Sequence, residues 1–571
     1  MIDVQKEIDR LFPNFNFRKF QRETITHIVE TFIENPKSNI IIDAPTGSGK
    51  SIITMFSSHI LNESLNKNGY ILTSDTTLQD QYEDDINNFS FPYVSVKGLD
   101  NYTCDINYNK MSTSDCILKN ITGAKRRALP CYSDCSYYSR RDKAGISPTA
   151  ILNYNYWLMQ QHFVSPNQQN PLFKKRDYVF FDEAHNVVNI VSNHFSPKIN
   201  ERILVNIQPV IDYNRLHKLF KNDPSIIFNK IQKIFNSLKK DMSPNDTLIS
   251  LKYLEQLLEK LIIGYPILLQ ENETITEKGD KIPEQNIYLL KMFKYVKDNH
   301  IKIKNYIKVV KSDPEGLVHK QFLNNDISLY CLEPSYMMKK VFHELYNFGT
   351  FLSATFLNHK FFVEHLGLKN TKIIEIPSTF NYEKSPIKFY TNYDMSYTKK
   401  DETIKQQIEM IDQIVSEHKS GIIHTGSTKN MMTLKEHTKN SKKIRFYNST
   451  AEKNAIILEL RHKKNFFIAG PSILEGLDMK DDISRCQIFM KIPYLNLGDS
   501  YIKKRFDKNK NWYLWETAIN FVQGIGRSIR SKDDYCETYI LDKGFYNILK
   551  TKVSGKSMLP GYITSRIKIY R

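Results

Sequence analysis

The sequence predicts an α/β fold with two parallel-sheet lobes and a helical insertion, and three observations support this prediction. Short apolar runs that resemble buried strands alternate with helical segments up to about residue 190 and again from residue 349 onwards. One of these runs, residues 39–43, leads into a glycine-rich loop, as strands of parallel sheets often do. Between the two regions, leucines recur every three or four residues from Leu248 to Leu261. This spacing predicts helices, so we expect two sheets separated in the chain by a helical segment.

The glycine-rich loop has the composition of a phosphate-binding loop, with the sequence Ala44, Pro45, Thr46, Gly47, Ser48, Gly49, Lys50 and Ser51. Gly47 and Gly49 let backbone N–H groups close around phosphate oxygens at the start of a helix. Lys50 adds a positive charge near the β- and γ-phosphates, and the Ser51 hydroxyl can bind Mg²⁺. Ala44 replaces the first glycine of the usual pattern, but the two glycines nearest the phosphates remain. A glycine-rich turn with an incidental lysine is the simpler alternative; the strand before the loop and the helical pattern after it favour nucleotide binding.

A second apolar strand ends in two acids that suit phosphate chemistry. Residues 177–181 lead into Asp182 and Glu183, followed by Ala184 and His185. We expect Asp182 to hold Mg²⁺ through water, and Glu183 to orient and deprotonate the attacking water. Alone, this pattern fits any acidic strand end. Together with the upstream phosphate loop, it predicts nucleotide hydrolysis.

Two other segments carry candidate nucleotide contacts. Arg18 and Gln21 precede the phosphate loop at the start of an expected helix, on which they share one face, and a glutamine amide can recognise an adenine edge. Near the other end of the chain, Gln523 is followed by Arg527 and Arg530, two arginines three residues apart. We expect these arginines on one helical face, where they can meet a γ-phosphate across a cleft. Surface arginines and glutamines without a role are the simpler alternative in both places.

Four of the seven cysteines crowd into one segment, at positions 104, 116, 131 and 135. Structural disulfides are rare inside cells, so Cys104, Cys116, Cys131 and Cys135 are candidate metal ligands. Zinc ribbons and fingers usually use two tight pairs of ligands, whereas only Cys131 and Cys135 are close together here. A [4Fe–4S] cluster tolerates this irregular spacing. We therefore expect a [4Fe–4S] cluster, with zinc or no cofactor as alternatives.

The overall composition favours a polyanionic partner. The chain has 571 residues, and its 80 Lys and Arg against 62 Asp and Glu give a formal net charge of +18. Solubility, or a compositional bias toward lysine, explains part of this excess equally well. Basic and aromatic residues alternate around the cysteines, a composition that suits single-stranded nucleic acid, although a solvated basic face is the alternative. The beginning of the sequence is charged and no apolar stretch is long enough for a membrane span, so we expect an intracellular protein. We expect it in the cytoplasm if the protein is bacterial or viral; for any other source the compartment is unknown.

Taken together, these motifs resemble the superfamily 2 helicases, and specifically the iron–sulfur branch that includes XPD and DinG. The resemblance covers nearly the whole chain. The matching motifs are residues 44–51 (motif I), 73–81 (Ia), 182–185 (II), 353–355 (III), 475–478 (V) and 523–530 (VI). The resemblance implies catalytic roles for Lys50, Asp182, Glu183, Gln523, Arg527 and Arg530, and nucleotide contacts by Arg18, Gln21 and Asp478 as well as by the phosphate loop.

The same resemblance implies two RecA-like lobes with ATP and Mg²⁺ between them, an iron–sulfur insertion and an all-helical Arch insertion in the first lobe. The implied domains are lobe 1 (residues 1–96, 151–190 and 348–372), the iron–sulfur domain (97–150), the Arch-like insertion (191–347) and lobe 2 (373–571). The implied activity is ATP-dependent movement along single-stranded DNA, 5′→3′, by a monomeric motor that unwinds forked DNA in replication or repair. The resemblance does not identify its protein partners. The alternatives are an ATPase that acts on RNA or displaces protein without unwinding, and a nucleic-acid-binding iron–sulfur redox sensor with a vestigial ATPase.

Overall fold

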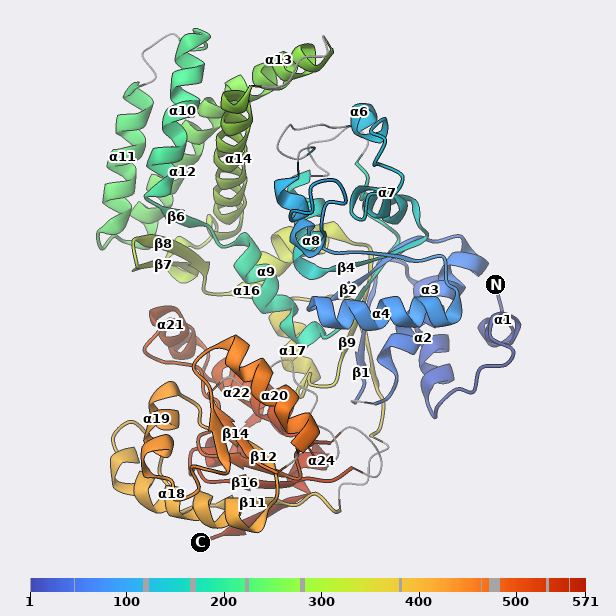
Figure 1. The fold of residues 1–571 in the computed structure, drawn as a ribbon, viewed down its shortest axis with the longest axis vertical. Helices are drawn as coiled ribbons and strands as arrows, with labels where there is room; N and C mark the ends of the chain where they lie inside the picture. The colour runs from blue at the N-terminus through green and yellow to red at the C-terminus, as the bar shows by residue number, and fades with distance from the viewer. Residues whose placement is uncertain are drawn as a thin grey trace. The chain divides into compact units, whose positions relative to one another are not determined.

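The computed structural model describes residues 2–45, 47–114, 116, 123–164, 171–220, 225–277, 283–378, 383–463, 465–471, 483–529, 534–553 and 555–571. The chain divides into two compact units. The first contains Met1–Ile42, Lys50–Leu352 and Val363–Ile374, and the second contains Asp43–Gly49, Ser353–Phe362 and Glu375–Arg571. Each unit is built on one seven-stranded sheet (Figure 1), so the predicted fold of two sheet lobes is confirmed.

The first sheet has the strand order β10-β1-β9-β5-β2-β4-β3. Its strands are β1 (Asn39–Asp43), β2 (Gly69–Thr73), β3 (Val94–Val96), β4 (Thr149–Asn153), β5 (Tyr178–Phe181), β9 (Phe348–Ser353) and β10 (Thr371–Glu375). The pairs of β2 with β4 and β5, of β3 with β4, and of β5 with β9 are all parallel. The central strands are buried on both faces, as their continuous apolar sequences require. Because β10 lies in this sheet, the expected lobe boundary at residue 373 falls inside a strand.

Register places the carboxyl ends of the central strands together. Leu72 of β2 lies opposite Phe181 of β5, and Phe181 lies opposite Phe351 of β9. The Asp182 N–H then donates to the Leu72 carbonyl at 2.9 Å. Side chains that follow these strands therefore meet at one edge of the sheet, where ligands of open α/β sheets bind.

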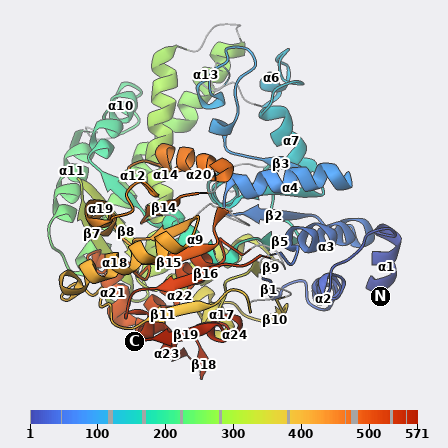
Figure 2. The ribbon, with the colours of Figure 1, turned by 60° about the horizontal axis from the view of Figure 1, so that its bottom comes forward.

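Helices connect the strands of this sheet and pack against it. They are α1 (Val4–Leu11), α2 (Gln21–Glu34), α3 (Lys50–Leu65), α4 (Thr76–Phe89), α8 (Tyr154–Met159), α9 (Val187–Phe195), α16 (Pro334–Met337) and α17 (His359–Leu366). The helix α4 packs against β2, β3 and β4, and α8 packs against β2 and β4. Figure 2 shows α4 beside β2 from a second direction. The cysteine segment lies between β3 and β4 and contains the helices α6 (Gly123–Arg127) and α7 (Tyr138–Ile146).

The insertion in the first unit is mostly helical, as its leucine spacing predicts. It contains α10 (Arg202–Leu216), α11 (Ser225–Lys239), α12 (Pro244–Leu261), α13 (Tyr265–Glu277), α14 (Glu284–Val310) and α15 (Pro314–Leu317). The six predicted leucines of α12, Leu248, Leu251, Leu254, Leu257, Leu258 and Leu261, are all buried.

The expectation of an all-helical insertion is wrong, because the insertion also holds a three-stranded antiparallel sheet. Its strands are β6 (Lys198–Asn200), β7 (Val318–Leu323) and β8 (Asp326–Cys331), in the order β6-β8-β7. Asn324 and Asn325 connect β7 to β8 with φ angles of 52° and 64°. Two successive positive φ angles are characteristic of a tight hairpin turn, and asparagine adopts them more readily than most residues. The Asn-Asn pair was therefore a local hairpin signal that the longer helical pattern obscured.

The second sheet has the order β13-β14-β12-β15-β16-β11-β19, and all its pairs are parallel. Its strands are β11 (Ile387–Tyr390), β12 (Gly421–His424), β13 (Ile444–Phe446), β14 (Phe467–Gly470), β15 (Cys486–Phe489), β16 (Glu537–Ile540) and β19 (Ile567–Tyr570). Its helices are α18 (Lys400–Glu417), α19 (Thr428–His437), α20 (Thr450–Lys463), α21 (Ser500–Lys508), α22 (Lys510–Ile525), α23 (Phe545–Lys550) and α24 (Gly561–Thr564). A short hairpin, β17 (Lys552–Val553) and β18 (Lys556–Ser557), completes this unit.

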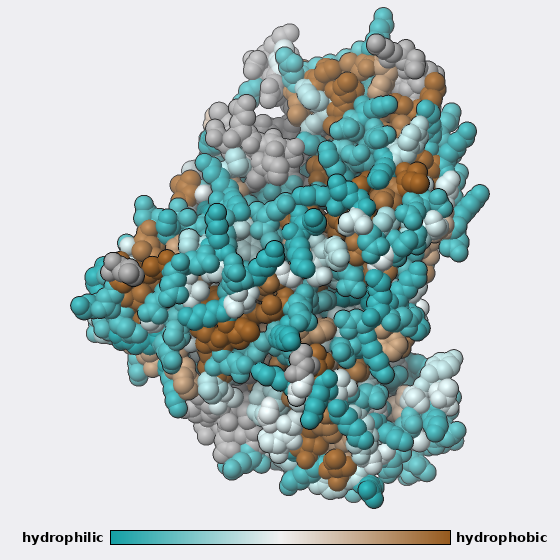
Figure 3. All heavy atoms as spheres, turned by 180° about the vertical axis from the view of Figure 1, so that it is seen from behind, coloured by the Kyte–Doolittle hydropathy of each residue, from teal (hydrophilic) through white to brown (hydrophobic). Residues whose placement is uncertain are grey.

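The surface of the structure carries mainly polar side chains on the face that Figure 3 shows, with apolar patches between them. Among the described residues, no helix combines the length and apolar character that a membrane crossing requires.

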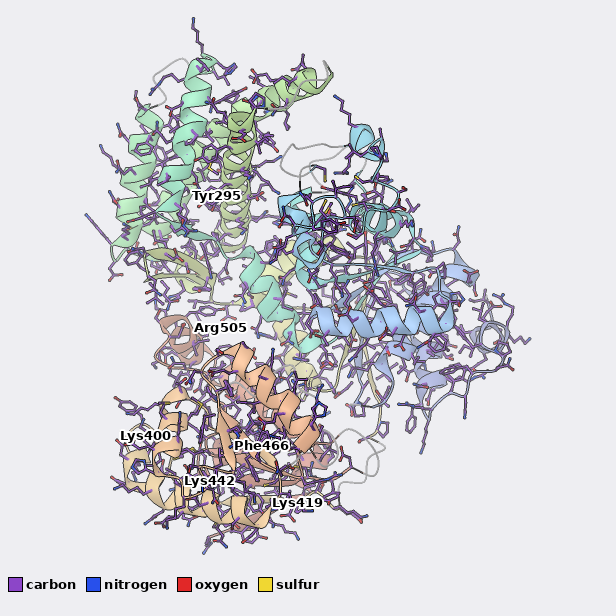
Figure 4. The ribbon with its side chains drawn as sticks, viewed as in Figure 1. Tyr295, Lys400, Lys419, Lys442, Phe466 and Arg505 are labelled. Atoms are coloured by element: carbon purple, nitrogen blue, oxygen red, sulfur yellow. The ribbon has the colours of Figure 1, made fainter. Side chains whose placement is uncertain are left out.

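In the second unit, the Arg505 guanidinium lies 3.6 Å from the centre of the Trp512 ring and so joins α21 to α22 (Figure 4).

Candidate functional site

The phosphate loop has the backbone that its glycines predict. Gly47 and Gly49 have φ angles of 79° and 80°, a conformation that side chains with a Cβ atom disfavour. The helix α3 begins at Lys50, directly after the loop, so its first N–H groups are available to an anion. The Ala44 methyl group is buried, and the Ala44 N–H donates to the Ser353 carbonyl at 2.9 Å. This bond ties the start of the loop to the end of β9. Thr46 lies outside the described residues.

Lys50 and Glu183 come together, as the two sequence motifs predict. The Lys50 Nζ atom lies 3.5 Å from Glu183 Oε1, and His185 Nδ1 lies 3.3 Å from Glu183 Oε2. Burial alone raises the pKa of Glu183, but the Lys50 ammonium and His185 outweigh burial and hold this pKa below its usual range. Glu183 also has a φ angle of 50°, which is uncommon for a residue other than glycine. The carboxylate is therefore ionised and held in one place by a positive charge.

Asp182 lies deeper, with only 2% of its surface exposed. The Tyr82 hydroxyl donates to Asp182 Oδ2 at 2.9 Å, and the Glu183 N–H donates to Oδ1 at 2.9 Å. The Tyr154 hydroxyl donates to the Asp182 carbonyl at 2.8 Å. Burial and the nearby Glu183 carboxylate raise the pKa of Asp182, although Lys50 opposes this shift. A buried carboxylate of this kind favours a nearby cation.

Ser51 follows Lys50 in the first turn of α3, and its hydroxyl interacts with the Asp85 carboxylate of α4. Burial raises the pKa of Asp85, and the Ser51 hydroxyl opposes this rise. Ser51, Asp182 and Glu183 all belong to the first unit. These hydroxyl and carboxylate oxygens are the donor atoms that Mg²⁺ prefers, so the residues fit this ion.

The second unit holds a histidine between two acids at the other end of the loop. His359 Nε2 lies 2.6 Å from Asp43 Oδ2, and His359 Nδ1 lies 3.0 Å from Glu375 Oε1. Burial alone lowers the pKa of His359, but the two carboxylates outweigh burial and raise it. Asp43 immediately precedes Ala44, so this contact fixes the backbone that enters the phosphate loop. The sequence pattern gave no sign of this histidine.

The arginine motif is only partly as expected. Gln523 lies in the last turn of α22, which ends at Ile525 with Gly526 as its C-cap. Arg527 therefore lies beyond the helix, and the prediction that Arg527 and Arg530 share a helical face is wrong for Arg527. Glycine residues at positions 524 and 526 favour this early end, because glycine stabilises helices poorly. Arg530 lies outside the described residues, as do residues 475–478 with Asp478.

The charge of Arg527 affects a histidine at the end of β12. Burial, together with the charge of Arg527, lowers the pKa of His424 to about 3, so the two side chains are neighbours. His424 ends β12, and its Nε2 atom lies 3.4 Å from Gln487 Oε1 of β15. Arg527 is half-buried in this second unit. His424 is therefore neutral beside Arg527.

Arg18 and Gln21 do not share a helical face, contrary to expectation, because α2 begins only at Gln21. Phe20 caps this helix with a φ angle of 71°, which turns the chain before the first helical residue. Gln21 is buried, and its Oε1 atom accepts a hydrogen bond from the Arg18 N–H at 2.8 Å. This bond holds the Arg18 segment beside the start of the helix.

The four crowded cysteines lie around one small cavity in the first unit. Its lining includes Cys104, Cys116, Cys131 and Cys135, together with Met111, Leu129, Tyr132 and Tyr138. Burial raises the pKa of Cys131, and the thiols of Cys135, Cys116 and Cys104 add to the shift. All four cysteines are free thiols. Four sulfur atoms converge on a mostly apolar cavity, and this donor set fits an iron–sulfur cluster.

Hydrogen bonds to the sulfur atoms support the same fit. The Tyr138 N–H donates to Cys135 Sγ at 3.4 Å, and Ser114 Oγ lies 3.3 Å from Cys116 Sγ. N–H and O–H groups beside metal-bound sulfur atoms are typical of iron–sulfur sites. The other cysteines, Cys331, Cys486 and Cys536, are buried away from this group.

Two family models match the chain. Residues 14–211 match the type III restriction enzyme res subunit, and residues 410–558 match the helicase C-terminal domain. The first match includes the phosphate loop, the cysteine segment and Glu183, whereas the second includes Arg527.

Known proteins resemble the chain along most of its length. The ATP-dependent DNA helicase CHL1 of Candida albicans is 23% identical over 511 residues, which cover 72% of this chain and 57% of that protein. The ATP-dependent DNA helicase YoaA of Haemophilus influenzae is 22% identical and covers 95% of this chain and 93% of that protein. The chain thus spans somewhat more than half the length of the CHL1 relatives. The solved structure of S. tokodaii Xpd4 has a TM-score of 0.58 at 14% identity and covers 97% of this chain and 100% of that one, so the two share a fold.

Proposed function

We propose that this chain, which belongs to the XPD/DinG-like superfamily 2 helicases, is an ATP-dependent DNA helicase that moves along single-stranded DNA and separates duplex strands. The observation that carries this proposal is the group formed by Lys50, Glu183 and Asp182 beside a glycine loop with two positive φ angles. This arrangement supplies a phosphate cradle, a positive charge, a site for a cation and an ionised base.

The group suggests how hydrolysis begins. Before nucleotide binds, the Lys50 ammonium pairs with Glu183 at 3.5 Å. ATP phosphates offer Lys50 a stronger partner, so nucleotide binding breaks this pair and frees the Glu183 carboxylate to accept a proton from water. Ser51 and Asp182 would hold Mg²⁺, and the ion would supply positive charge near the phosphates. Tyr82 and Tyr154 keep the Asp182 segment in position.

The arginine motif and the loop contacts complete the proposed nucleotide site. We assign Gln523, Arg527 and Arg530 to the stabilisation of the γ-phosphate, and Arg18, Gln21 and Asp478 to nucleotide contacts, on the strength of their places in the motif order. The charge of Arg527 acts at the end of β12, and strand ends of this kind suit ligand contacts, which supports the assignment.

The insertions supply the proposed DNA-handling parts. Residues 97–150 form an iron–sulfur domain in which Cys104, Cys116, Cys131 and Cys135 bind a [4Fe–4S] cluster. When bound, the cluster ties loops of this segment together. The mainly helical residues 191–347 form an Arch-like domain, and the two sheet units form the motor lobes. By family resemblance, movement is 5′→3′ along the strand, and the motor acts as a monomer on forked DNA in replication or repair.

ATPase measurements with different nucleic acids test the proposal. Turnover is measured without nucleic acid, with single-stranded DNA and with single-stranded RNA of the same sequence. We expect strong stimulation by DNA and loss of activity in Lys50→Ala, since no neighbouring group replaces the lost charge. The matched control is Lys419→Ala, a change at an exposed lysine labelled in Figure 4. Stimulation by RNA alone favours an RNA translocase, and turnover in Lys50→Ala equal to that of the unchanged protein contradicts the nucleotide site.

A further inference from the structure

Arg126 is a buried cation beside the four cysteines. It lies in the last turn of the short helix α6, and 8% of its surface is exposed. Arg126 lines the same cavity as Cys104, Cys116, Cys131 and Cys135. Its guanidinium carbon lies 3.9 Å from the centre of the Tyr138 ring, and Tyr138 in turn donates its N–H to Cys135. The arginine is thus held against the wall of the cysteine cavity by stacking.

No described carboxylate pairs with Arg126. The Asp142 carboxylate interacts with the charge of Arg126 but is shared with Arg141, at 2.6 Å, and with the Tyr132 hydroxyl. The Asp105 carboxylate lines the same cavity and accepts a hydrogen bond from the Ser136 N–H at 3.5 Å. The Nε atom of Arg126 is buried and has no hydrogen-bond partner among the described residues. A largely buried guanidinium that forms no ion pair of its own with a described carboxylate is unfavourable, so this position favours a further anion in the cavity.

The proposed cluster would carry the negative charge that the position of Arg126 favours. A [4Fe–4S] core held by four thiolates carries net negative charge, and one-electron reduction adds another negative charge. We propose that Arg126 is the counter-ion of this cluster and that its charge raises the cluster's reduction potential. The inference rests on the cluster assignment in the proposed function. It adds a role for a residue that binds no iron itself.

The reduction potential tests this role directly. The anaerobically purified full-length protein is titrated with dithionite in the presence of redox mediators, and the one-electron reduction is followed by electron paramagnetic resonance. In Arg126→Met, the lost charge disfavours the reduced form, and we expect the equilibrium constant for reduction to fall about tenfold. For a one-electron couple this corresponds to a potential about 59 mV more negative. Arg127→Met, a change at the exposed neighbour in α6, is the matched control and leaves the potential unchanged.

Other outcomes separate this inference from the cluster assignment. An unchanged potential in an Arg126→Met protein with a full complement of iron overturns the role of Arg126 and leaves the cluster in place. Wild-type protein without iron overturns both. If Arg126→Met loses its iron, Arg126→Lys decides: a bound cluster with a potential near that of the wild type supports a role for the charge, whereas loss of iron from this variant too shows that Arg126 acts only through packing.

Discussion

At the scale of single residues, the chemistry of this protein depends on charges held in buried places. Glu183 has a φ angle of 50° and keeps a carboxylate beside Lys50, although burial opposes its charge. Such a conformation persists only when surrounding contacts enforce it. Here the Glu183 N–H donates to Asp182 Oδ1 at 2.9 Å, and the Glu183 carbonyl accepts from the Asn186 N–H at 3.1 Å. The strain is therefore consistent with a carboxylate positioned for catalysis.

The role of Glu183 as base predicts a separation of binding from hydrolysis. In Glu183→Gln the amide keeps the shape of the side chain but cannot accept a proton, so we expect turnover to fall about 10²- to 10⁴-fold. The affinity for ATP stays close to that of the wild type. Single-turnover hydrolysis and equilibrium binding of a fluorescent ATP analogue measure the two effects. Glu409→Gln, at an exposed acid, is the control. Weak ATP binding with normal turnover of the bound fraction contradicts this role.

Tyr82 predicts an effect on the magnesium requirement. Its hydroxyl bonds to Asp182 Oδ2 at 2.9 Å, and groups that orient a metal ligand typically change metal affinity about 10- to 100-fold. In Tyr82→Phe, ATPase activity should therefore need about 10- to 100-fold more Mg²⁺ for half-saturation. The measurement is a Mg²⁺ titration at saturating ATP. Tyr253→Phe, at an exposed tyrosine of α12, is the control. An unchanged half-saturating concentration shows that the Tyr82 hydroxyl does not position the metal ligand.

At the scale of elements, most strands of the first sheet were predictable from the sequence, whereas the strand at its edge was not. The strands β1, β2 and β5 each contain a continuous run of three or four apolar residues, and β9 is buried throughout, so the sequence pattern predicted these strands. The edge strand β10 was missed, because exposed Lys and Glu side chains interrupt its apolar pattern. Helix ends were also harder to predict than helix positions. The helix α2 begins only at Gln21, and α22 ends at Ile525, before Arg527.

The contacts within the candidate site were harder to predict from the sequence than its motifs. The phosphate loop and the two acids are local patterns, whereas Tyr82, Tyr154 and His359 reach the site only through the fold. Tyr82 and Asp182 are separated by 100 residues. No spacing rule connects side chains on different elements in this way. Arg126 is one of several basic residues near the cysteines, and its burial distinguishes it from its exposed neighbour Arg127.

The cysteine segment predicts that cluster loss is separable from hydrolysis. In Cys131→Ser the hydroxyl stays protonated and binds iron poorly, so the cluster should be lost and residues 97–150 should lose their fixed shape. Lys50, Asp182 and Glu183 lie outside this segment, so ATP hydrolysis should persist in part while strand separation fails. Wild-type protein should be brown with about four irons per chain. Cys331→Ser, at a buried cysteine outside the cavity, is the control and should keep its iron.

Two results contradict that account. Stoichiometric zinc in anaerobically purified wild-type protein overturns the cluster. Normal strand separation by a colourless Cys131→Ser protein shows that the segment is not needed for unwinding.

At the scale of the whole molecule, two parallel sheets each present strand ends with polar residues, and the chain carries a formal net charge of +18. The charge favours binding to the phosphates of a nucleic acid. Lys50, Asp182 and Glu183 belong to the first unit and Arg527 to the second, so the proposed function draws on residues of both units.

The basic surface predicts salt-sensitive binding of DNA. Each phosphate contact by Lys or Arg releases condensed counter-ions, so the logarithm of the binding constant should fall linearly with the logarithm of salt concentration, with a slope of roughly −0.7 for each contact on a single strand. Fluorescence anisotropy of a labelled oligonucleotide at several salt concentrations measures this slope. Binding that does not change with salt shows that the positive charge has another role.

Strand separation on duplexes with a single tail tests the central claim most directly. The same duplex carries either a 5′ or a 3′ single-stranded tail, and release of a labelled strand is followed with and without ATP. The proposed function predicts ATP-dependent release from the 5′-tailed duplex, no release from the 3′-tailed duplex, and loss of release in Glu183→Gln. Release from the 3′-tailed duplex alone contradicts the polarity. If neither duplex is unwound by protein that contains its cluster and hydrolyses ATP with single-stranded DNA, the chain is not a helicase.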